Sequence, residues 1–251
     1  MCRHGLILLA LGSLVTLLPG KTIRADVTGD GIDDIIKMGM KMVTVQDGAS
    51  NKLHTIIAGI DDLADMSIDN FFEGTKGNEI ALLRLPEKSC FTEVYGYRNK
   101  RFIKVSDALP GELSMDEDGR LFGYSTHAWD RNEVMIYWPI LEYGGHLKPA
   151  EVKLFSETSL VVEPHKTEEF PIDLHRSTFA MCVASTLDKD VVVFLLDDDG
   201  TLIKQAMIDP QTGFYGRIIT ENAKTVTLNI DNSKSPKQKT IHIIIKQYEY
   251  P

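Results

Sequence analysis

The spacing of short β-prone runs constrains the fold of this chain more than any other feature. After the first 25 residues, runs rich in Val, Ile, Thr, Phe and Tyr recur about every ten residues, separated by Gly, Asp, Asn or Pro. Helical periodicity is hard to find over the same stretch. The sequence therefore predicts an all-β protein. In its first half the expected strands are residues 35–38, 42–46, 54–58, 80–84, 92–97, 102–105, 121–125 and 134–138.

A weak internal repeat runs through these strands. Each copy places a polar residue and an acid just before an apolar strand, at Asp33-Asp34, Asn78-Glu79 and Asn132-Glu133. The acids lie 45 and then 54 residues apart, which suits one four-stranded blade per repeat, as in β-propellers, with an insertion in the last. Acids before strands are also common in β proteins, so the spacing alone leaves a plain β arrangement open. Three blades do not close a propeller, which needs at least about four, so we expect a partial or open one.

The pattern of the strands changes from about residue 160. Compact runs follow at residues 179–185, 191–196, 202–208, 225–230 and 241–247, as in a β-sandwich. A Pro-containing tract at residues 163–171 is the expected entrance to this domain. The fold prediction is therefore propeller-like blade repeats over residues 26–155, followed by a β-sandwich over residues 156–251.

The first residues have the pattern of an export signal. Arg3 and His4 supply a short basic start, and residues 6–18 form a nearly unbroken apolar run, too short to span a membrane. Cleavage after Gly20 or after Ala25 would leave a small residue at the cut, so the signal is assigned to residues 1–25. We expect a periplasmic or extracellular protein with no membrane insertion after the signal is removed. A buried N-terminal helix of a cytoplasmic protein is the alternative reading.

The charge balance limits the classes of partner. The formal net charge is −9, with a pI near 5.3, whereas nucleic acids and anionic membranes are bound by concentrated basic surfaces. Nucleic acid is therefore not an expected partner, and cations are favoured. The two cysteines beyond the signal, Cys90 and Cys182, permit one disulfide but do not require it.

The segment from Asp26 to Asp34 carries the most specific chemistry in the sequence. Calcium takes six to eight hard oxygen ligands, and alternate positions of a tight loop can aim side chains inward while a glycine permits the bend. Gly31 stands at the sixth position of this segment, where such a bend is needed. The candidate ligands are the side chains of Asp26, Thr28, Asp30 and Asp34 and the backbone carbonyl of Ile32. An Asp-Gly turn whose acids merely face solvent is the alternative.

This loop, with the strand-like residues 35–38 after it, resembles one FG-GAP or VCBS-type repeat, the blade unit of integrin-like propellers. The resemblance implies a Ca²⁺ ion bound at the edge of a blade. Thr28 departs from the Asp or Asn more usual in the family, which implies a weaker site or a water in the shell. The loop also differs from an EF-hand, because its twelfth position is Lys37 rather than a bidentate Glu.

The second half resembles, more loosely, the pre-peptidase C-terminal domains of secreted bacterial hydrolases. The similarity rests on residues 169–174 and on the strand and Asp-rich hairpin of residues 191–200. It implies an accessory β-sandwich. The hairpin acids Asp197, Asp198 and Asp199 can be read as a second cation site or as a solvated hairpin tip.

No catalytic constellation stands out, so the sequence predicts neither an enzyme nor catalytic residues. Gly-x-Ser-x-Gly, His-Glu-x-x-His, phosphate-loop and Cys-x-x-Cys motifs are all missing. His127 lies near Asp130, and His165 lies near Glu168 and Glu169; these could serve as acid–base or metal groups, but lone histidines near acids are usually incidental. The densest aromatic cluster offers Trp129, Trp138 and Tyr143 as a partner-binding surface. Burial of these rings in a blade core is the alternative.

The leading functional hypothesis is a calcium-binding module of adhesion type, in which the ion rigidifies a β scaffold that presents loops to a protein or glycan. Its support is the loop of residues 26–34 together with the export pattern. The rivals are an accessory component of a secreted polymer-degrading system and an inhibitor of a foreign enzyme. The sequence does not name the partner.

Overall fold

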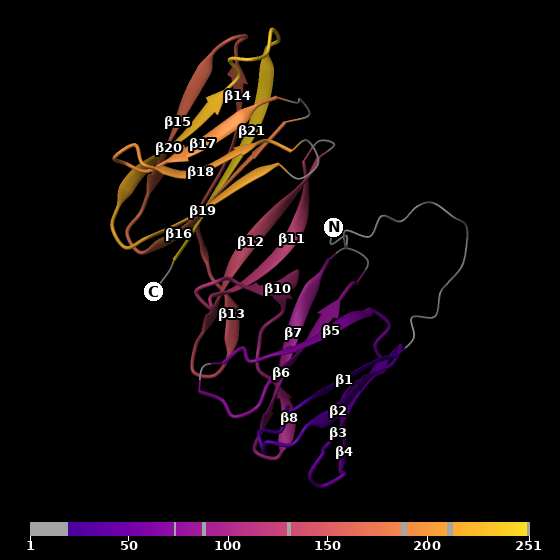
Figure 1. The fold of residues 1–251 in the computed structure, drawn as a ribbon. Coiled ribbons are helices and arrows are strands. Elements are labelled where there is room, and N and C mark those ends of the chain that lie inside the picture. The colour runs from indigo at the N-terminus through magenta and orange to yellow at the C-terminus, as the bar shows by residue number, and fades with distance from the viewer. Residues whose placement is uncertain are drawn as a thin grey trace, which may run out of the picture. The chain divides into compact units, whose positions relative to one another are not determined.

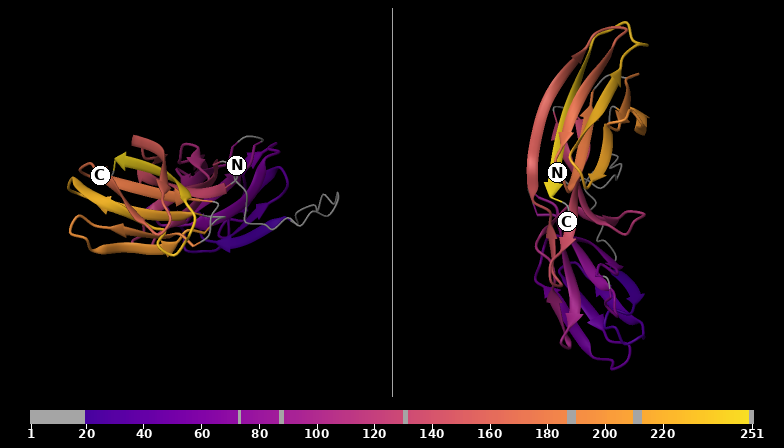
Figure 2. Two further views of the ribbon diagram at one scale, coloured as in Figure 1. Left: turned by 90° about the horizontal axis from the view of Figure 1, so that it is seen from above. Right: turned by 90° about the vertical axis from the view of Figure 1, so that its left-hand side faces the viewer.

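The computed structural model describes residues 20–72, 74–86, 89–129, 132–186, 190–209 and 213–249, and only the backbone of residues 126–129 and 132–135. Over this part of the chain the ordered elements are 21 β-strands in antiparallel sheets (Figure 1). The further views show only strands and loops in the coloured residues (Figure 2). The predicted all-β class is confirmed. No helix in the described part is long and apolar enough to cross a membrane. The expected apolar run at residues 6–18 lies outside the described part, whereas residues 21–25, assigned from the sequence to the signal, form strand β1 and pair with β2.

The chain divides into two compact units. The first comprises residues 1–125 and 140–149, and the second comprises residues 126–139 and 150–251. The strands β11 (Leu121–Trp129) and β12 (Asn132–Glu142) each contribute to both.

The first unit contains three sheets, each built on four strands in simple chain order, the arrangement expected of blade repeats. The first sheet is β1 (Lys21–Ala25), β2 (Asp34–Met38), β3 (Met42–Gln46) and β4 (Leu53–Ala58). The second is β5 (Leu63–Asp69), β6 (Glu79–Arg84), β7 (Phe91–Arg98) and β8 (Arg101–Lys104), with the short β9 (Leu109–Pro110) beside β7. The third is β10 (Glu112–Met115), β11, β12 and β13 (Leu147–Pro149).

Alternating side chains explain why these sheets pack face to face. Ile80 and Leu82 of β6 share one core cluster with Ile36 of the first sheet. Ala81, between them in sequence, joins a different cluster with Ile140 of the third sheet. Successive residues of a strand point to opposite faces, so β6 is buried on both sides and the second sheet lies between the other two. The predicted four-stranded antiparallel units are confirmed.

The repeat predicted from the sequence is correct for two copies and wrong for the third. Asp34 and Glu79 are the first residues of β2 and β6, the second strands of their sheets. Glu133 lies instead in β12, the third strand of its sheet. The second strand there is β11, which begins at Leu121, 42 residues after Glu79. The blade spacing is thus nearly even, and no insertion is needed.

The second unit is a sandwich of two four-stranded sheets. One has the order β14 (Val152–Val162), β21 (Lys239–Glu249), β16 (Thr178–Ser185) and β19 (Phe214–Thr220). The other has the order β15 (Thr167–Leu174), β20 (Lys224–Asp231), β17 (Val192–Leu196) and β18 (Leu202–Met207). Their facing side chains form one core, with Cys182, Val193, Leu228 and Ile243 among its members. Residue 156 falls inside β14, and the tract at residues 163–171 is largely strand β15 rather than an entrance loop.

The strand β16 is buried on both faces, and this explains why residues 126–139 belong to the second unit. Ala180 and Cys182 face the sandwich core, while Met181 lies on the opposite face and is also buried. Tyr137 of β12 covers that outer face: its N–H donates to the Met181 sulfur at 3.2 Å, and its carbonyl accepts from the Tyr248 hydroxyl at 3.0 Å. Cys182 is a buried free thiol, so Cys90 and Cys182 do not form a disulfide.

Candidate calcium loop

The candidate calcium loop, residues 26–33, connects β1 to β2 in the first unit. Its ends meet where Ala25 pairs with Asp34 across the two strands. Gly29 and Gly31 have φ angles of 79° and 85°, a left-handed conformation that glycine adopts without strain. The Asp26 carboxylate accepts the N–H groups of both glycines, at 2.6 Å from Gly29 and 2.8 Å from Gly31. Asp26 therefore folds the loop around its own side chain.

Thr28 holds a polar atom that the surrounding protein does not satisfy. Its Oγ1 is buried and has no hydrogen-bond partner among the described residues. A buried polar group without a partner costs about 1–3 kcal/mol, and such groups in native structures are normally met by water or an ion. Thr28 is the third residue of the loop, one of the positions predicted to bind calcium.

Asp34 closes the loop from the inside. Its side chain is fully buried. One carboxylate oxygen accepts the N–H groups of Val27 at 2.9 Å and Thr28 at 3.0 Å, and the other accepts that of Gly48 at 2.8 Å. A carboxylate has about four lone-pair positions, so most of its capacity holds the backbone. Asp34 is first of all a structural acceptor, which the spacing argument did not foresee.

Asp30 and Ile32 lie at the exposed tip of the loop. The Asp30 side chain accepts the Ile32 N–H at 2.9 Å, and Ile32 is 49% exposed. The negative charge of the loop also acts on Tyr97 in the second sheet. Burial raises the pKa of Tyr97, and the nearby charges of Asp47, Asp34 and Asp30 raise it further. The potential at the loop is therefore negative, as a cation site requires.

The loop also docks on the equivalent loop of the second sheet. Asn78 donates two hydrogen bonds to the Asp26 carbonyl, from its backbone N–H at 2.9 Å and from its side-chain amide at 3.2 Å. Gly77 makes this approach possible, because a Cβ there would lie 2.8 Å from the backbone nitrogen of Gly29. Asn78, the polar residue before Glu79, thus joins the second sheet to the first.

Glu79 is the counterpart of Asp34 in the second sheet. It is fully buried, accepts the Phe71 N–H at 3.0 Å and forms an ion pair of 2.9 Å with Arg98. Phe71 stands two residues beyond β5, as Val27 stands two residues beyond β1. The repeated acid at the start of the second strand is therefore a buried hydrogen-bond acceptor that fixes the preceding loop.

Compared with a conventional metal centre, the loop brings few acidic side chains together in space. No group of three or more His, Cys, Asp or Glu side chains in the described part of the chain is arranged to hold a metal ion. Any calcium ligand set here must therefore draw on neutral oxygens, such as the Thr28 hydroxyl and the Ile32 carbonyl, beside Asp26 and Asp30.

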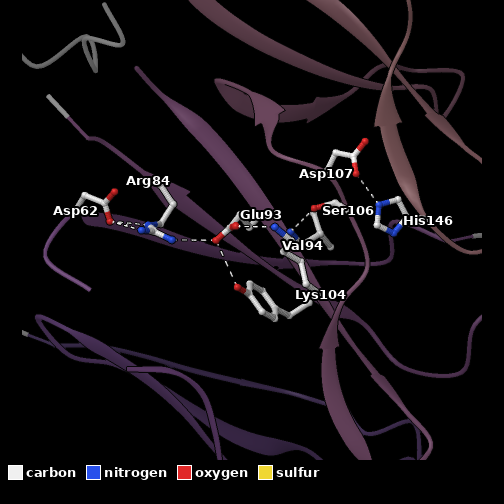
Figure 3. A network of polar contacts seen from close by, with 9 residues as sticks. Asp62, Arg84, Glu93, Val94, Lys104, Ser106, Asp107 and His146 are labelled. Atoms are coloured by element: carbon white, nitrogen blue, oxygen red, sulfur yellow. Dashed lines mark hydrogen bonds and ion pairs between the residues drawn. The ribbon is translucent and has the colours of Figure 1, made fainter. Parts of the chain in front are cut away.

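A partly buried ion network in the second sheet was not predicted (Figure 3). The Arg84 guanidinium donates from Nε to Asp62 at 2.6 Å and from Nη1 to Glu93 at 2.9 Å, and Lys104 donates to the same Glu93 at 2.9 Å. Burial and the neighbouring Glu93 charge raise the pKa of Tyr95 to about 12. These charges neutralise one another, so the network serves the fold. Its members are far apart in sequence, so spacing alone could not reveal it.

The other candidate residues are engaged elsewhere or lie outside the described part. Asp197 accepts the Lys224 ammonium at 2.6 Å, and Asp199 accepts the Thr201 N–H at 2.8 Å. His165 contacts the carbonyl of Ser233 at 3.0 Å. The side chains of His127, Trp129 and Asp130 are not among those described.

The remaining aromatic candidates belong to different units. Trp138 belongs to the second unit and is partly buried, with the Lys246 ammonium 4.8 Å from its ring centroid. Tyr143 belongs to the first unit and is 56% exposed. Because the two rings belong to separate units, the predicted joint surface stays a prediction.

Comparisons with known proteins leave the family open. The sequence matches no family model and no curated protein. Among solved structures, an exo-β-1,3-galactanase from Phanerochaete chrysosporium bound to β-1,3-galactotriose is 7% identical, with a TM-score of 0.37 over 91% of this chain and 69% of that one. A GH32 β-fructofuranosidase from Bombyx mori is 8% identical, with a TM-score of 0.23 over 92% and 76%. Similarity this low supports no inference about activity.

Proposed function

We propose that this chain is an exported calcium-binding β scaffold that binds a protein or glycan partner and does not catalyse a reaction. The observation that carries the calcium assignment is the buried Oγ1 of Thr28, which has no partner among the described residues, inside a loop that also carries Asp26 and Asp30. The proposed export rests on the N-terminal sequence pattern. The non-catalytic role is supported by the lack of known catalytic motifs in the sequence and by the structural use of the ion pairs described above.

The residues of the loop fit a modest calcium site. Asp26 and Asp30 would supply charge, Thr28 and the Ile32 carbonyl would supply neutral oxygens, and water would complete the six to eight ligands that calcium takes. The Asp34 carboxylate would act mainly by holding the Val27 and Thr28 backbone in place. Because charge count sets much of the affinity of calcium loops, two carboxylates imply a weak site of the extracellular kind.

Calcium would stabilise the junction of the first two sheets. The Asp26 carbonyl already accepts both hydrogen bonds from Asn78, so an ion that orders Asp26 also orders the contact between the sheets. An ion that binds only the folded state adds about 2.7 kcal/mol at a hundredfold excess over its Kd. The expected result is a more rigid scaffold for presenting loops to a partner.

Calorimetric titration and thermal melts with calcium and with chelator test the proposal on Thr28→Val. Removing an unsatisfied buried hydroxyl at nearly constant volume should leave the calcium-free protein as stable as before, or slightly more so. The same change should weaken calcium binding and reduce the rise in Tm. Asp33→Asn, which alters a charge in the same loop outside the proposed ligand set, is the matched control.

The outcomes separate clearly. Binding of calcium that Thr28→Val and Asp30→Asn weaken, and that Asp33→Asn retains, supports the assignment. A Tm that is identical in calcium and in chelator would refute it. Capture of a partner from periplasmic or extracellular extract, with and without calcium, then tests the scaffold role. Turnover of a glycan, peptide or ester by the purified protein would overturn the non-catalytic reading.

A further inference from the structure

The four edge strands of the sandwich unit differ in how they are protected. Edge strands expose unpaired backbone groups and invite another strand to pair with them. Pro171 lies within β15 and has no N–H to offer. At the opposite side, Lys204 of β18 donates to the Tyr215 carbonyl of β19 at 2.8 Å and so bridges the two edges.

The strand β14 is protected only at its start, where the register shifts between Val152 and Leu154 and Lys153 pairs with Glu249. It extends over 11 residues without Pro or Gly, and in the described part of the chain it pairs only with β21. Leu160 and Val162 point into the sandwich core. On the opposite face, Phe155 and Val161 are 52% and 45% exposed. A long edge with exposed apolar side chains is a site where another strand is expected to bind.

We propose that a second copy of this chain covers β14, paired antiparallel to it about a twofold axis at Thr158. Opposite residues of an antiparallel pair share a face of the sheet, whereas adjacent residues of one strand point to opposite faces. A twofold axis between two adjacent residues would place them opposite each other, so the axis must pass through a residue. With the axis at Thr158, Phe155 lies opposite Val161 of the second copy, and Leu154 lies opposite Val162. The two four-stranded sheets then form one continuous sheet.

The charge of Glu157 selects this register over its neighbours. An axis at Glu157 would place the two carboxylates directly opposite each other, which is destabilising. An axis at Ser156 would place Phe155 against Glu157, and an axis at Ser159 would place Val161 against Glu157. Only the Thr158 axis joins the two exposed apolar side chains and leaves Glu157 opposite an uncharged residue, Ser159.

Neighbouring side chains hold Phe155 ready for this contact. Phe155 pairs with Lys246 of β21, whose ammonium lies 5.5 Å from the Phe155 ring centroid and 4.8 Å from that of Trp138. An ordered ring loses less side-chain entropy when it becomes buried at an interface. The second copy's Val161 would therefore extend an existing row of packed side chains.

Sedimentation velocity of the full chain over a range of concentrations is the first test. We expect a reversible dimer that Phe155→Lys and Val161→Lys each weaken at least tenfold. Met207→Lys is the matched control, because Met207 is an apolar residue, 60% exposed, on a different edge strand, β18. Phe155→Lys combined with Val161→Glu places opposite charges across the axis and should restore dimerisation. A chain that stays monomeric at every accessible concentration would refute the proposal.

Disulfide trapping tests the register directly. Thr158→Cys should cross-link to its own copy under mild oxidation, because residues opposite each other in an antiparallel pair have Cα atoms about 4.5–5.5 Å apart, within disulfide reach. Ser156→Cys should not, because its own copy lies four residues along the strand, about 13 Å away. Equal or faster cross-linking of Ser156→Cys would contradict the Thr158 axis. Melting curves of both variants confirm that the fold is intact.

Discussion

Asp34 and Glu79 are equivalent residues in successive sheets of the first unit. Each begins the second strand of its sheet, is fully buried, and accepts the N–H group two residues beyond the preceding strand. Their second oxygens differ in partner. Asp34 accepts another backbone N–H, from Gly48, whereas Glu79 pairs with the charged Arg98. The same buried carboxylate is therefore satisfied by backbone hydrogen bonds in one sheet and by a charged side chain in the next.

The hydrogen bonds accepted by Asp34 predict that Asp34→Ala strongly lowers the free energy of unfolding. Three backbone N–H groups would lose their acceptor, and hydrogen bonds to charged groups contribute about 1.5–3 kcal/mol each. We expect a loss of at least about 3 kcal/mol in the free energy of unfolding, measured by urea denaturation. Asp33→Ala should cost less than about 0.5 kcal/mol, since Asp33 is exposed. Equal effects of the two changes would show that the hydrogen bonds of Asp34 contribute little.

The Glu79–Arg98 pair predicts strong coupling in a double-mutant cycle. Arg98→Met leaves a fully buried carboxylate without its cation, which costs about 3–5 kcal/mol. Glu79→Gln combined with Arg98→Met removes both charges and should cost less than Arg98→Met alone. Urea denaturation of the two single variants and the double variant gives the coupling energy. Additive effects would mean that the ion pair has no net role.

The sequence predicted every inner strand of the described sheets and missed most of the edge strands. Residues 35–38 and 42–46 correspond to β2 and β3 almost residue for residue, because polar turn residues bound short apolar runs there. The missed edge strands are β1, β5, β10, β13, β14, β15 and β19, and the short β9 was missed too. Edge strands bury little, so β14 lacks a clear apolar alternation, and Pro171 interrupts the pattern of β15.

The candidate site shows a different limit of sequence reasoning. Spacing identified Asp26 and Asp34 but could not tell that both bind backbone N–H groups. The partners of Asp34 are set by how the loop folds, and one of them, Gly48, comes from beyond β3. Spacing also gave Glu79 no role, since its partner Arg98 lies at the far end of β7.

The acid limit of stability should depend on the β17–β18 hairpin. The Lys224 ammonium, followed by the Asp198 N–H, lowers the pKa of Asp197 below its ordinary 3.8. A carboxyl group with a lowered folded-state pKa adds stability above about pH 3.8, and this contribution is lost as the pH falls through the lowered value. Asp197→Asn should therefore reduce stability at pH 6 and flatten its fall between about pH 4 and 2. An unchanged slope in urea melts across that range would contradict the assignment.

The outer face of β16 predicts how fragments of the second unit behave. A fragment of residues 150–251 keeps both sheets but loses the Tyr137 segment that covers Met181. It should fold and expose apolar surface, seen as increased binding of a hydrophobic dye. A fragment of residues 126–251 should bind less dye and melt at a higher temperature. A fragment starting at residue 156 also loses part of β14 and should be the least stable. An equal melting temperature for all three would count against the role of Tyr137.

Calcium binding should change the ionisation of Tyr97. Burial is the main cause of its raised pKa, and the charges of Asp47, Asp34 and Asp30 add to it. A cation in the loop offsets part of this negative potential and favours the phenolate, so saturating calcium should lower the pKa of Tyr97. Ultraviolet titration of the phenolate, as the difference between the parent chain and Tyr97→Phe, isolates this group. Repeating the titration in Thr28→Val gives the control, because weaker binding should shrink the shift. A Tyr97 pKa that is the same in calcium and in chelator, in a protein that binds the ion by calorimetry, would place the ion away from Asp30 and Asp34.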